Sequence, residues 1–165
     1  MDKKNAVIAD KCYCDSTLVA EDVSISLPAV TFLTTEVNAM GTMSVVLAGL
    51  IEDMEASITK IGIDKGLKKM LTPVKHSFEF RGVQNNLKAD GTTKPEGFKA
   101  FLTAVPKGIP STSIEIGSNI ENEVALAVSR YQLFVNGDEI CCIDRLSQIC
   151  RINGKDYYAN IKSLL

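Results

Sequence analysis

Alternation of apolar and polar side chains with a period of two residues is the feature of this chain that most limits its fold. The alternation recurs in residues 23–27, 54–62, 74–83 and 98–105. Successive side chains of a β-strand point to opposite faces of a sheet, so this spacing predicts strands with one buried and one solvated face. Pro28 ends the first segment because proline has no backbone N–H to donate. The pattern favours a mainly antiparallel β fold.

Turn chemistry predicts a further hairpin near the C-terminal end. Residues 124–135 form a long, largely apolar stretch, and Asn136-Gly137-Asp138 follows it. An Asn-Gly pair supplies the positive φ angles that a tight hairpin turn needs. We therefore expect residues 139–143 to pair back on this stretch.

Two segments predict short helices. Residues 64–71 begin with Asp64, a favourable N-cap residue, and Pro73 follows their end. Residues 155–165 carry an apolar stripe, with Asp156 as the expected N-cap.

Length and composition indicate a single domain covering residues 1–165. Hydrophobic side chains make up 45% of the chain and charged ones 23%, which is enough apolar material for a core. We interpret residues 85–97 and 106–117 as loops because glycine, proline and polar residues are frequent in them. An alternating stretch at 113–116 predicts a short strand within the second loop. The path of residues 1–18 is not predicted.

Charge and hydropathy exclude several classes of protein. The net charge of −2 excludes a duplex-DNA binder that acts by neutralising phosphates. No apolar run reaches the roughly 18 residues of a membrane-spanning helix. No apolar segment follows Lys3 and Lys4, so we expect neither a secretory signal nor stable membrane association.

Side chains suited to catalysis or metal binding are sparse. Glu79 is the acid nearest to His76 in its segment, but it falls on the opposite strand face, so we expect a wall or interface histidine rather than a catalytic one. The acidic cluster of Glu52, Asp53 and Glu55 has no flanking aromatic sugar platform. The cysteines lack the paired spacing of a zinc site, and their odd number favours free thiols in a reducing compartment. These cysteines are Cys12, Cys14, Cys141, Cys142 and Cys150. We expect no catalytic site, metal or cofactor.

The longest predicted strands raise a problem of exposed edges. Residues 41–50 and 52–62 are expected to pair as one hairpin, and residues 74–84 and 97–106 as another, with the helix at 64–72 between them. The edges of such a sheet are prone to pair with other chains. Closure between identical copies in a ring removes these edges.

The chain resembles the major tail tube protein of contractile-tailed phages and R-type bacteriocins of the pyocin and diffocin kind. The resemblance rests on the order and spacing of short motifs from about residue 19 onward. In chain order they are VSISLP at 23–28, an arm at 31–41, FEFRG at 78–82, YQLFVNGDEI at 131–140, ID at 143–144, CRINGKD at 150–156 and LL at 164–165. The arm departs from the family in lacking a run of glycines.

This resemblance implies a β-sandwich or barrel-like subunit with a short helix between two long hairpins and a helix at the C-terminus. Hexameric rings would close one continuous β-barrel and stack head to tail into a hollow tube, with a mechanical rather than enzymatic function. The implied partners are copies of itself, a sheath protein, and tape-measure and baseplate proteins, with DNA only as transient cargo in a phage. The implied location is the tail of a virion or bacteriocin particle that is assembled in the bacterial cytoplasm.

The alternation then divides the strand residues between the channel and the subunit core. The residues expected to face the lumen are Thr42, Ser44, Glu55, Ser57, Thr59, Lys75, Ser77, Glu79, Arg81 and Thr103. Those expected to face the core are Met54, Ala56, Ile58, Phe78, Phe80, Phe98, Ala100 and Leu102. The lumen set balances two acids against two bases, whereas a DNA conduit favours an acidic wall that repels phosphates. The balance favours a bacteriocin over a phage.

The arm at 31–41 and the polar tip at 85–97 are the expected contacts between rings, because they are long and have no core of their own. The candidate stacking residues are Thr31, Thr34, Glu36, Asn38, Asn86, Lys88 and Asp90. Two alternatives remain open. One is the tube of a type VI secretion or extracellular contractile injection system. The other is a small β-sandwich binding module or hydrolase that uses Glu52, Asp53 and Glu55.

Overall fold

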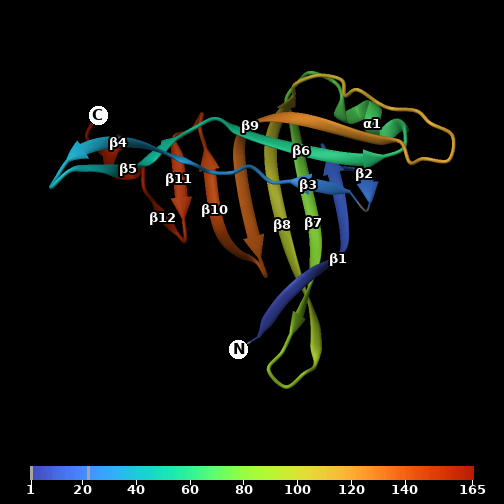
Figure 1. Cartoon of the computed structure of the whole chain (residues 1–165), viewed down its shortest axis with the longest axis horizontal. Helices are drawn as coiled ribbons and strands as arrows, with labels where there is room; N and C mark the ends of the chain where they lie inside the picture. The colour runs from blue at the N-terminus through green and yellow to red at the C-terminus, as the bar shows by residue number, and fades with distance from the viewer. Residues whose placement is uncertain (1, 22) are drawn as a thin grey trace.

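The computed structural model of the chain describes residues 2–21 and 23–165, and these residues form mainly antiparallel strands (Figure 1). In chain order the elements are β1 (Lys3–Cys14), β2 (Thr17–Glu21), β3 (Ser24–Ser26), β4 (Phe32–Asn38), β5 (Thr42–Ile51), β6 (Met54–Ile61), α1 (Lys65–Met70), β7 (His76–Leu87), β8 (Thr93–Pro106), β9 (Glu121–Val135), β10 (Asp138–Asp144), β11 (Ile149–Ile152), β12 (Lys155–Asp156) and α2 (Ala159–Ser163). Within the described ranges, neither helix is long and apolar enough to cross a membrane.

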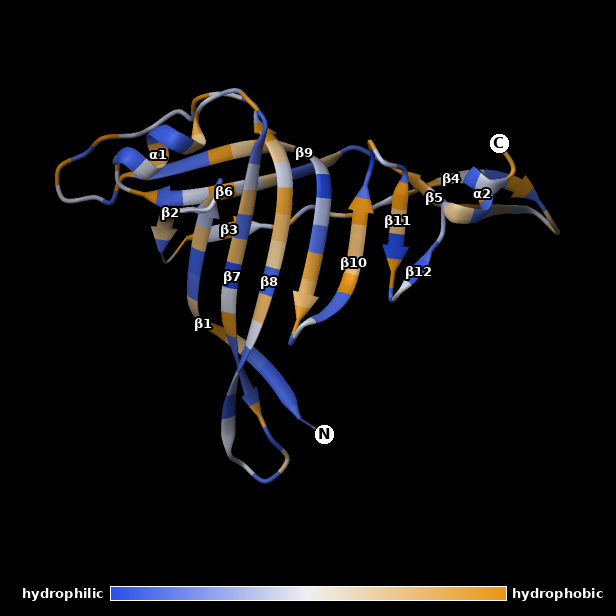
Figure 2. Cartoon of the chain, turned by 180° about the vertical axis from the view of Figure 1, so that it is seen from behind, coloured by the Kyte–Doolittle hydropathy of each residue, from blue (hydrophilic) through white to orange (hydrophobic). Residues whose placement is uncertain are grey.

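Two layers of strands form a sandwich. The large layer runs in the order β12-β11-β10-β9-β8-β7-β1-β2. The smaller layer consists of β3, β6 and the first part of β9. Figure 1 shows β6 crossing β7 and β8 at a steep angle, and Figure 2 shows the same crossing from behind. The layers therefore pack in the orthogonal manner, in which a strand turns the corner between them.

β9 is the strand that turns this corner. Its residues 121–128 pair with β6, whereas its residues 130–135 pair with β10. The register with β8 skips Ser129, which makes a β-bulge that bends the strand. The Ser129 hydroxyl donates to the Thr103 carbonyl at 3.2 Å, so the bulge is held in place from β8.

The core lies between the two layers and contains the inward side chain of every second strand position. Figure 2 shows the resulting hydrophobic and hydrophilic bands along β7 and β8. Ile58 of β6, Phe78 of β7 and Leu102 of β8 are at most 2% exposed. Full burial of each such side chain contributes roughly 1.5 to 3 kcal/mol.

Helix α1 closes one end of the sandwich. The Asp64 carboxylate accepts a hydrogen bond from the Leu67 backbone N–H at 3.0 Å, so Asp64 caps the helix as predicted. Leu67 and Met70 are buried in the core. Gly66 lies so close to β2 that a Cβ atom built on it would be 2.2 Å from the Val19 carbonyl oxygen.

Much of the strand prediction is confirmed. The observed β6, β7, β8, β9 and β10 cover the predicted alternating and hairpin segments. Of the residues expected to face the core, all are buried except Phe98, which is half-buried.

The first predicted hairpin, between residues 41–50 and 52–62, is wrong. β5 pairs with β4, and β6 pairs with β3 and β9. The physical reason is that inward side chains of β6 match those of β9, with Ile58 opposite Val124 in the buried core. Pairing with β5 would remove this apolar partner. In chain order α1 still lies between two hairpins, but the first of them is β4–β5, and β6 separates this hairpin from the helix.

Three local predictions are also wrong. Residues 85–97 do not form a loop throughout, because β7 and β8 continue through this segment with Asn86 opposite Lys94. Residues 113–116 contain no strand. The C-terminal helix is limited to α2, because Asp156 accepts from the backbone N–H groups of Cys150 and Tyr158 within a turn rather than capping a helix.

The N-terminal segment, whose path was not predicted, supplies β1 and the start of β2. Residue 1 lies outside the described residues. β1 enters the large sheet between β7 and β2.

Candidate assembly surfaces

The outer side of the large sheet carries most of the charged side chains discussed below, and we call it the polar face. It consists of the side chains of β1, β7, β8, β9, β10 and β11 that point away from the core. By the register of these strands it includes Lys11, Tyr13, Ser77, Glu79, Arg81, Lys99, Phe101, Thr103, Arg130, Gln132, Phe134, Glu139, Asp144 and Arg151.

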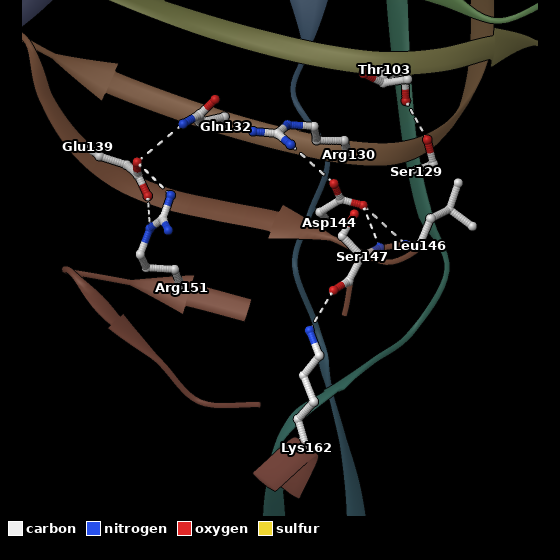
Figure 3. Close-up of polar contacts among 10 residues, drawn as sticks. All are labelled: Thr103, Ser129, Arg130, Gln132, Glu139, Asp144, Leu146, Ser147, Arg151 and Lys162. Carbon is white, nitrogen blue, oxygen red and sulfur yellow. Dashed lines mark hydrogen bonds and ion pairs between the residues drawn. The ribbon is translucent and has the colours of Figure 1, made fainter. Parts of the chain in front are cut away.

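Glu139 joins three strands of the polar face. It accepts two hydrogen bonds from the Arg151 guanidinium at 2.6 and 3.1 Å, and one from the Gln132 amide at 3.2 Å (Figure 3). The hydrogen bonds from Arg151 hold the pKa of Glu139 below its ordinary value. Strands β9, β10 and β11 are thus connected by side chains as well as by backbone pairing.

Asp144 makes a second polar junction beside Glu139. One of its oxygens accepts from the Arg130 guanidinium at 3.1 Å, and the other accepts from the backbone N–H groups of Leu146 and Ser147 at 3.1 Å (Figure 3). Burial by itself would raise the pKa of Asp144, but the hydrogen bonds from Ser147 and the charge of Arg130 lower it. The carboxylate therefore fixes the β10–β11 turn to β9.

Charges on the polar face are compensated at short range. Glu79 accepts a hydrogen bond from the Arg81 guanidinium at 2.6 Å. The Arg81 Cζ atom also lies 4.6 Å from the centroid of the Tyr13 ring, in a cation–π contact. Lys11 and Glu21 form another pair across β1 and β2 at 3.6 Å. Among the described residues, Lys99 has no ion pair, so the polar face carries charges of both signs with a small excess of positive charge.

The predicted lumen residues are distributed over three surfaces. Ser77, Glu79, Arg81 and Thr103 lie on the polar face, and the exposed Lys75 immediately precedes β7. Glu55, Ser57 and Thr59 point outward from β6, on the opposite outer side of the sandwich. Thr42 and Ser44 lie on β5, in the separate β4–β5 hairpin. The structure therefore does not bring all of these residues together on one surface.

The β4–β5 hairpin, which we call the ribbon, projects from one end of the molecule (Figure 1). The residues on one of its faces are mainly polar. In paired order they are Thr34 with Val46, Glu36 with Ser44, and Asn38 with Thr42. The predicted stacking residues of the arm therefore share this face with two predicted lumen residues, while Thr31 precedes the ribbon and its carbonyl accepts from the Glu52 N–H at 2.9 Å.

The opposite face of the ribbon is mainly apolar, and the sequence interpretation missed it. In paired order its residues are Leu33 with Leu47, Thr35 with Val45, and Val37 with Met43. Val37 and Met43 are 44% and 49% exposed. Alternation in residues 33–37 and 43–47 was the available signal, but the arm at 31–41 was expected to have no core of its own and to serve only as a contact between rings.

The β7–β8 tip carries the other predicted stacking residues. Asn86 lies within the paired part of the hairpin, whereas Lys88 and Asp90 lie in the turn between the strands. Asp90 accepts from the backbone and hydroxyl groups of Thr92, which shape this turn and lower the pKa of Asp90.

His76 has a carboxylate partner that no local pattern indicated. Its Nδ1 lies 2.7 Å from Asp15 Oδ2, and its Nε2 lies 2.9 Å from the Thr72 carbonyl oxygen. Asp15 also accepts from the Ser77 N–H at 3.0 Å. These bonds fasten the β1–β2 turn to the start of β7. Asp15 is far from His76 in sequence, so only the tertiary fold brings the two together.

The neighbouring Cys14 completes a group whose ligand-type atoms lie within 4.8 Å of one another. Burial raises the pKa of Cys14 to about 11, which keeps a metal-free thiol protonated at neutral pH. The cysteines at 12, 142 and 150 are also buried, and all five are free thiols. Asp15 and His76 are already engaged in hydrogen bonds, so this group acts as a structural fastening.

The acidic cluster considered for hydrolytic chemistry is split between two elements. Glu52 and Asp53 lie in the connection between β5 and β6, whereas Glu55 lies on β6 and forms an ion pair with Lys107. Glu52 contributes its backbone, whose carbonyl accepts from Arg145 at 2.8 Å.

Comparisons with known proteins show which family and which solved structure this chain resembles. No curated protein sequence matches the chain. Among solved structures, this chain is similar to a protein chain of the "Cryo-EM Structure of an Extracellular Contractile Injection System, PVC sheath-tube complex in extended state". The TM-score is 0.53 and the identity 14%, over 76% of this chain and 88% of that one, which shows a shared fold. The family model of phage tail tube protein FII matches residues 4–165. The chain, with its orthogonal β-sandwich and projecting ribbon, therefore belongs to the phage tail tube protein FII family.

Proposed function

We propose that this tail tube protein assembles into hexameric rings that stack head to tail into a hollow tube. The observation that carries the proposal is the shape of the large sheet, whose outermost strands β2 and β12 lie toward opposite ends of the molecule (Figure 1). Edge-to-edge contact between successive copies extends such a sheet around an axis until it closes.

The polar face is the best candidate for the wall of the channel. It extends over β1 and β7 to β11 of the large sheet, and each of its carboxylates pairs with an Arg side chain. A wall of paired charges holds neither anionic nor cationic cargo strongly. Ser77, Glu79, Arg81 and Thr103 then line the bore, while Glu55, Ser57 and Thr59 face away from it.

The function in this proposal is mechanical, without an enzymatic step, cofactor or metal. A contractile sheath would surround the tube, and tape-measure and baseplate proteins would set its length and cap it. The particle would be a phage tail or a bacteriocin tail assembled in the bacterial cytoplasm. The polar face carries five Lys or Arg residues and three carboxylates, so it lacks the acidic excess that would repel DNA, and this favours a bacteriocin. A phage would instead pass DNA as transient cargo.

Electron microscopy of the purified protein tests assembly directly. We expect rings or tubes with an axial hole, and a protein that stays monomeric at every concentration and salt condition contradicts the proposal.

Cysteine labelling tests which outer side of the sandwich faces the bore. In assembled tubes, Ser77→Cys is expected to react with a small maleimide but not with one attached to a polymer too bulky to enter. Ser57→Cys, on the outer side of β6, is the matched control and is expected to react with both. The unsubstituted protein reports any background from Cys141. The reverse pattern would place the β6 side at the channel.

A further inference from the structure

The apolar face of the ribbon is an incomplete interface. Leu33 is 39% exposed, and Val37 and Met43 are exposed further toward the tip. A two-stranded hairpin is at best marginally stable unless its apolar side is covered. Glu36, the charged residue of the ribbon, lies on the other face, so covering the apolar face buries no ionised side chain.

A second incomplete surface lies between β1 and β3. Here a hollow of about 550 Å³ has a floor formed by Phe80 and Phe98. Its walls include Val7 and Ile8, which are 57% and 58% exposed, and Leu27. Asp10 and Ser24 are its polar lining residues. The hollow exists because β6 and β3 cross the large sheet near one end of β7 and β8 (Figure 1).

The hollow is bordered by strand edges that can accept further pairing. Among the described residues, β3 pairs with β6 alone. In the part of the chain that the structure describes, β1 pairs with β2 from Lys11 to Cys14, and between Lys3 and Ala9 its described pairing is with β7 alone. β4 and β5 likewise pair only with each other within the described chain. Free edges on both surfaces allow an extended segment to add to a sheet while its alternate side chains fill a pocket.

The two surfaces are separated within one molecule. The ribbon projects beyond β11, whereas β10, β9, β8 and β7 intervene in the large sheet before β1 (Figure 1). Contact between two different surfaces of identical chains is heterologous, and it propagates into rings or filaments. A tail tube requires contacts of this kind.

We propose that the apolar face of the ribbon of one copy docks into the hollow between β1 and β3 of a second copy. This inference rests on the proposed tube assembly and names the surfaces that make one of its contacts. Val37 and Met43 enter against Ile8, Leu27 and Phe98 of the second copy, and the polar face of the ribbon remains outward.

A pair of matched substitutions tests the side of the ribbon. Val37→Glu places a charge on the docking face, and we expect at least about a tenfold rise in the protein concentration needed for assembly. Thr34→Glu places the same charge on the opposite face and is expected to assemble like the unsubstituted protein. Thermal unfolding of the unassembled chains checks that both variants fold. Folded Val37→Glu protein that assembles normally overturns the inference, as does a loss of assembly confined to Thr34→Glu.

Disulfide formation between two differently labelled chains tests the partner surface. One chain carries Val37→Cys, and the other carries either Ile8→Cys or Leu27→Cys. Oxidised heterodimers are expected in the mixtures and not when Val37→Cys is oxidised alone. Tubes that form with no such cross-link to either position overturn the inference and leave the tube proposal intact. Cross-linking to an added sheath protein instead would also overturn it. Failure of the unsubstituted protein to assemble would contradict the tube proposal itself.

Discussion

The sandwich and the ribbon have the same alternating sequence pattern, but among the described residues only the sandwich is covered along its whole apolar side. The ribbon packs on the core at its base, through Phe32 and Ile51, and is exposed toward its tip. In the sandwich, Ile58 and Phe78 are at most 2% exposed because β6 packs across β7 and β8. In the ribbon, Val37 and Met43 occupy the equivalent inward positions of paired strands, yet each is more than 40% exposed. The same pattern therefore gives a buried core in the sandwich and an exposed apolar face toward the tip of the ribbon.

This difference separates two kinds of stability. Contacts within the sandwich are present in the isolated chain, so their contribution is independent of protein concentration. In the proposed assembly, the contacts of the ribbon form only when another molecule covers it. Their contribution to stability therefore increases with protein concentration. Substitutions in the two regions should consequently differ in their dependence on concentration.

The largest expected effect is truncation of the core. Phe78→Ala should lower the free energy of unfolding by about 3 to 5 kcal/mol, because it removes a buried ring and leaves a cavity. Val37→Ala in the ribbon is the matched comparison and should change the unfolding of unassembled protein by less than about 0.5 kcal/mol. Denaturant unfolding at low protein concentration measures both. A large loss for Val37→Ala under these conditions would show that the ribbon is already covered within its own chain.

A smaller effect is expected where α1 meets the sandwich. Gly66→Ala should cost about 1 to 3 kcal/mol because the new Cβ would meet the Val19 carbonyl oxygen at 2.2 Å. Gly108→Ala is the control, since nothing lies within 4 Å of a Cβ at that position. Equal unfolding midpoints for the two variants would show that α1 can move away from β2 without loss.

The sequence predicted the strands of the sandwich better than their pairing. Period-two alternation is a local property, so it located β6, β7 and β8 and assigned their inward side chains. The partner of β6 depends instead on where β9 bends, and the bend at Ser129 leaves no recognisable local signal. Proximity along the chain therefore favoured pairing with β5, whereas burial against β9 decided the fold.

The candidate surfaces were only partly predictable for the same reason. Ser77, Glu79, Arg81 and Thr103 share one face because they lie on neighbouring, alternating strands. The pairing of Glu139 with Arg151 and of Asp15 with His76 depends on turns and strand order that the local pattern does not specify. The alternation indicated the apolar face of the ribbon. Only the pairing of β4 with β5 and the exposure of Val37 and Met43 show that this face is available for contact with another molecule.

A weaker effect is expected at the fastening between β1 and β7. Hydrogen bonds from the Ser77 N–H and from His76 lower the pKa of Asp15 below its ordinary value of 3.8. The folded protein therefore holds this carboxylate ionised more strongly than the unfolded chain does. The stabilisation is complete above the ordinary value and is lost as the pH falls through the lower, folded-state pKa.

Asp15→Asn should accordingly make the free energy of unfolding less dependent on pH in the acid range. Unfolding measured from pH 2 to pH 7, an interval of about 5 pH units, covers the titration of Asp15. His76→Gln should reduce this pH dependence less, because the Ser77 hydrogen bond is the larger cause and remains. An unchanged acid slope in Asp15→Asn would show that the fastening contributes no pH dependence.

The smallest expected effect is on the polar face. Glu139→Gln should lower the free energy of unfolding by less than about 1 kcal/mol, because both partners of its ion pair with Arg151 are partly exposed to water. A double-mutant cycle with Arg151→Gln, measured by denaturant unfolding, isolates the pair from the other contacts of each residue. A coupling near that of a buried pair would mean that the polar face is protected from solvent in the single chain. A small coupling energy would instead show that water screens this ion pair in the single chain. The polar face would then be exposed to solvent before assembly, like the apolar face of the ribbon.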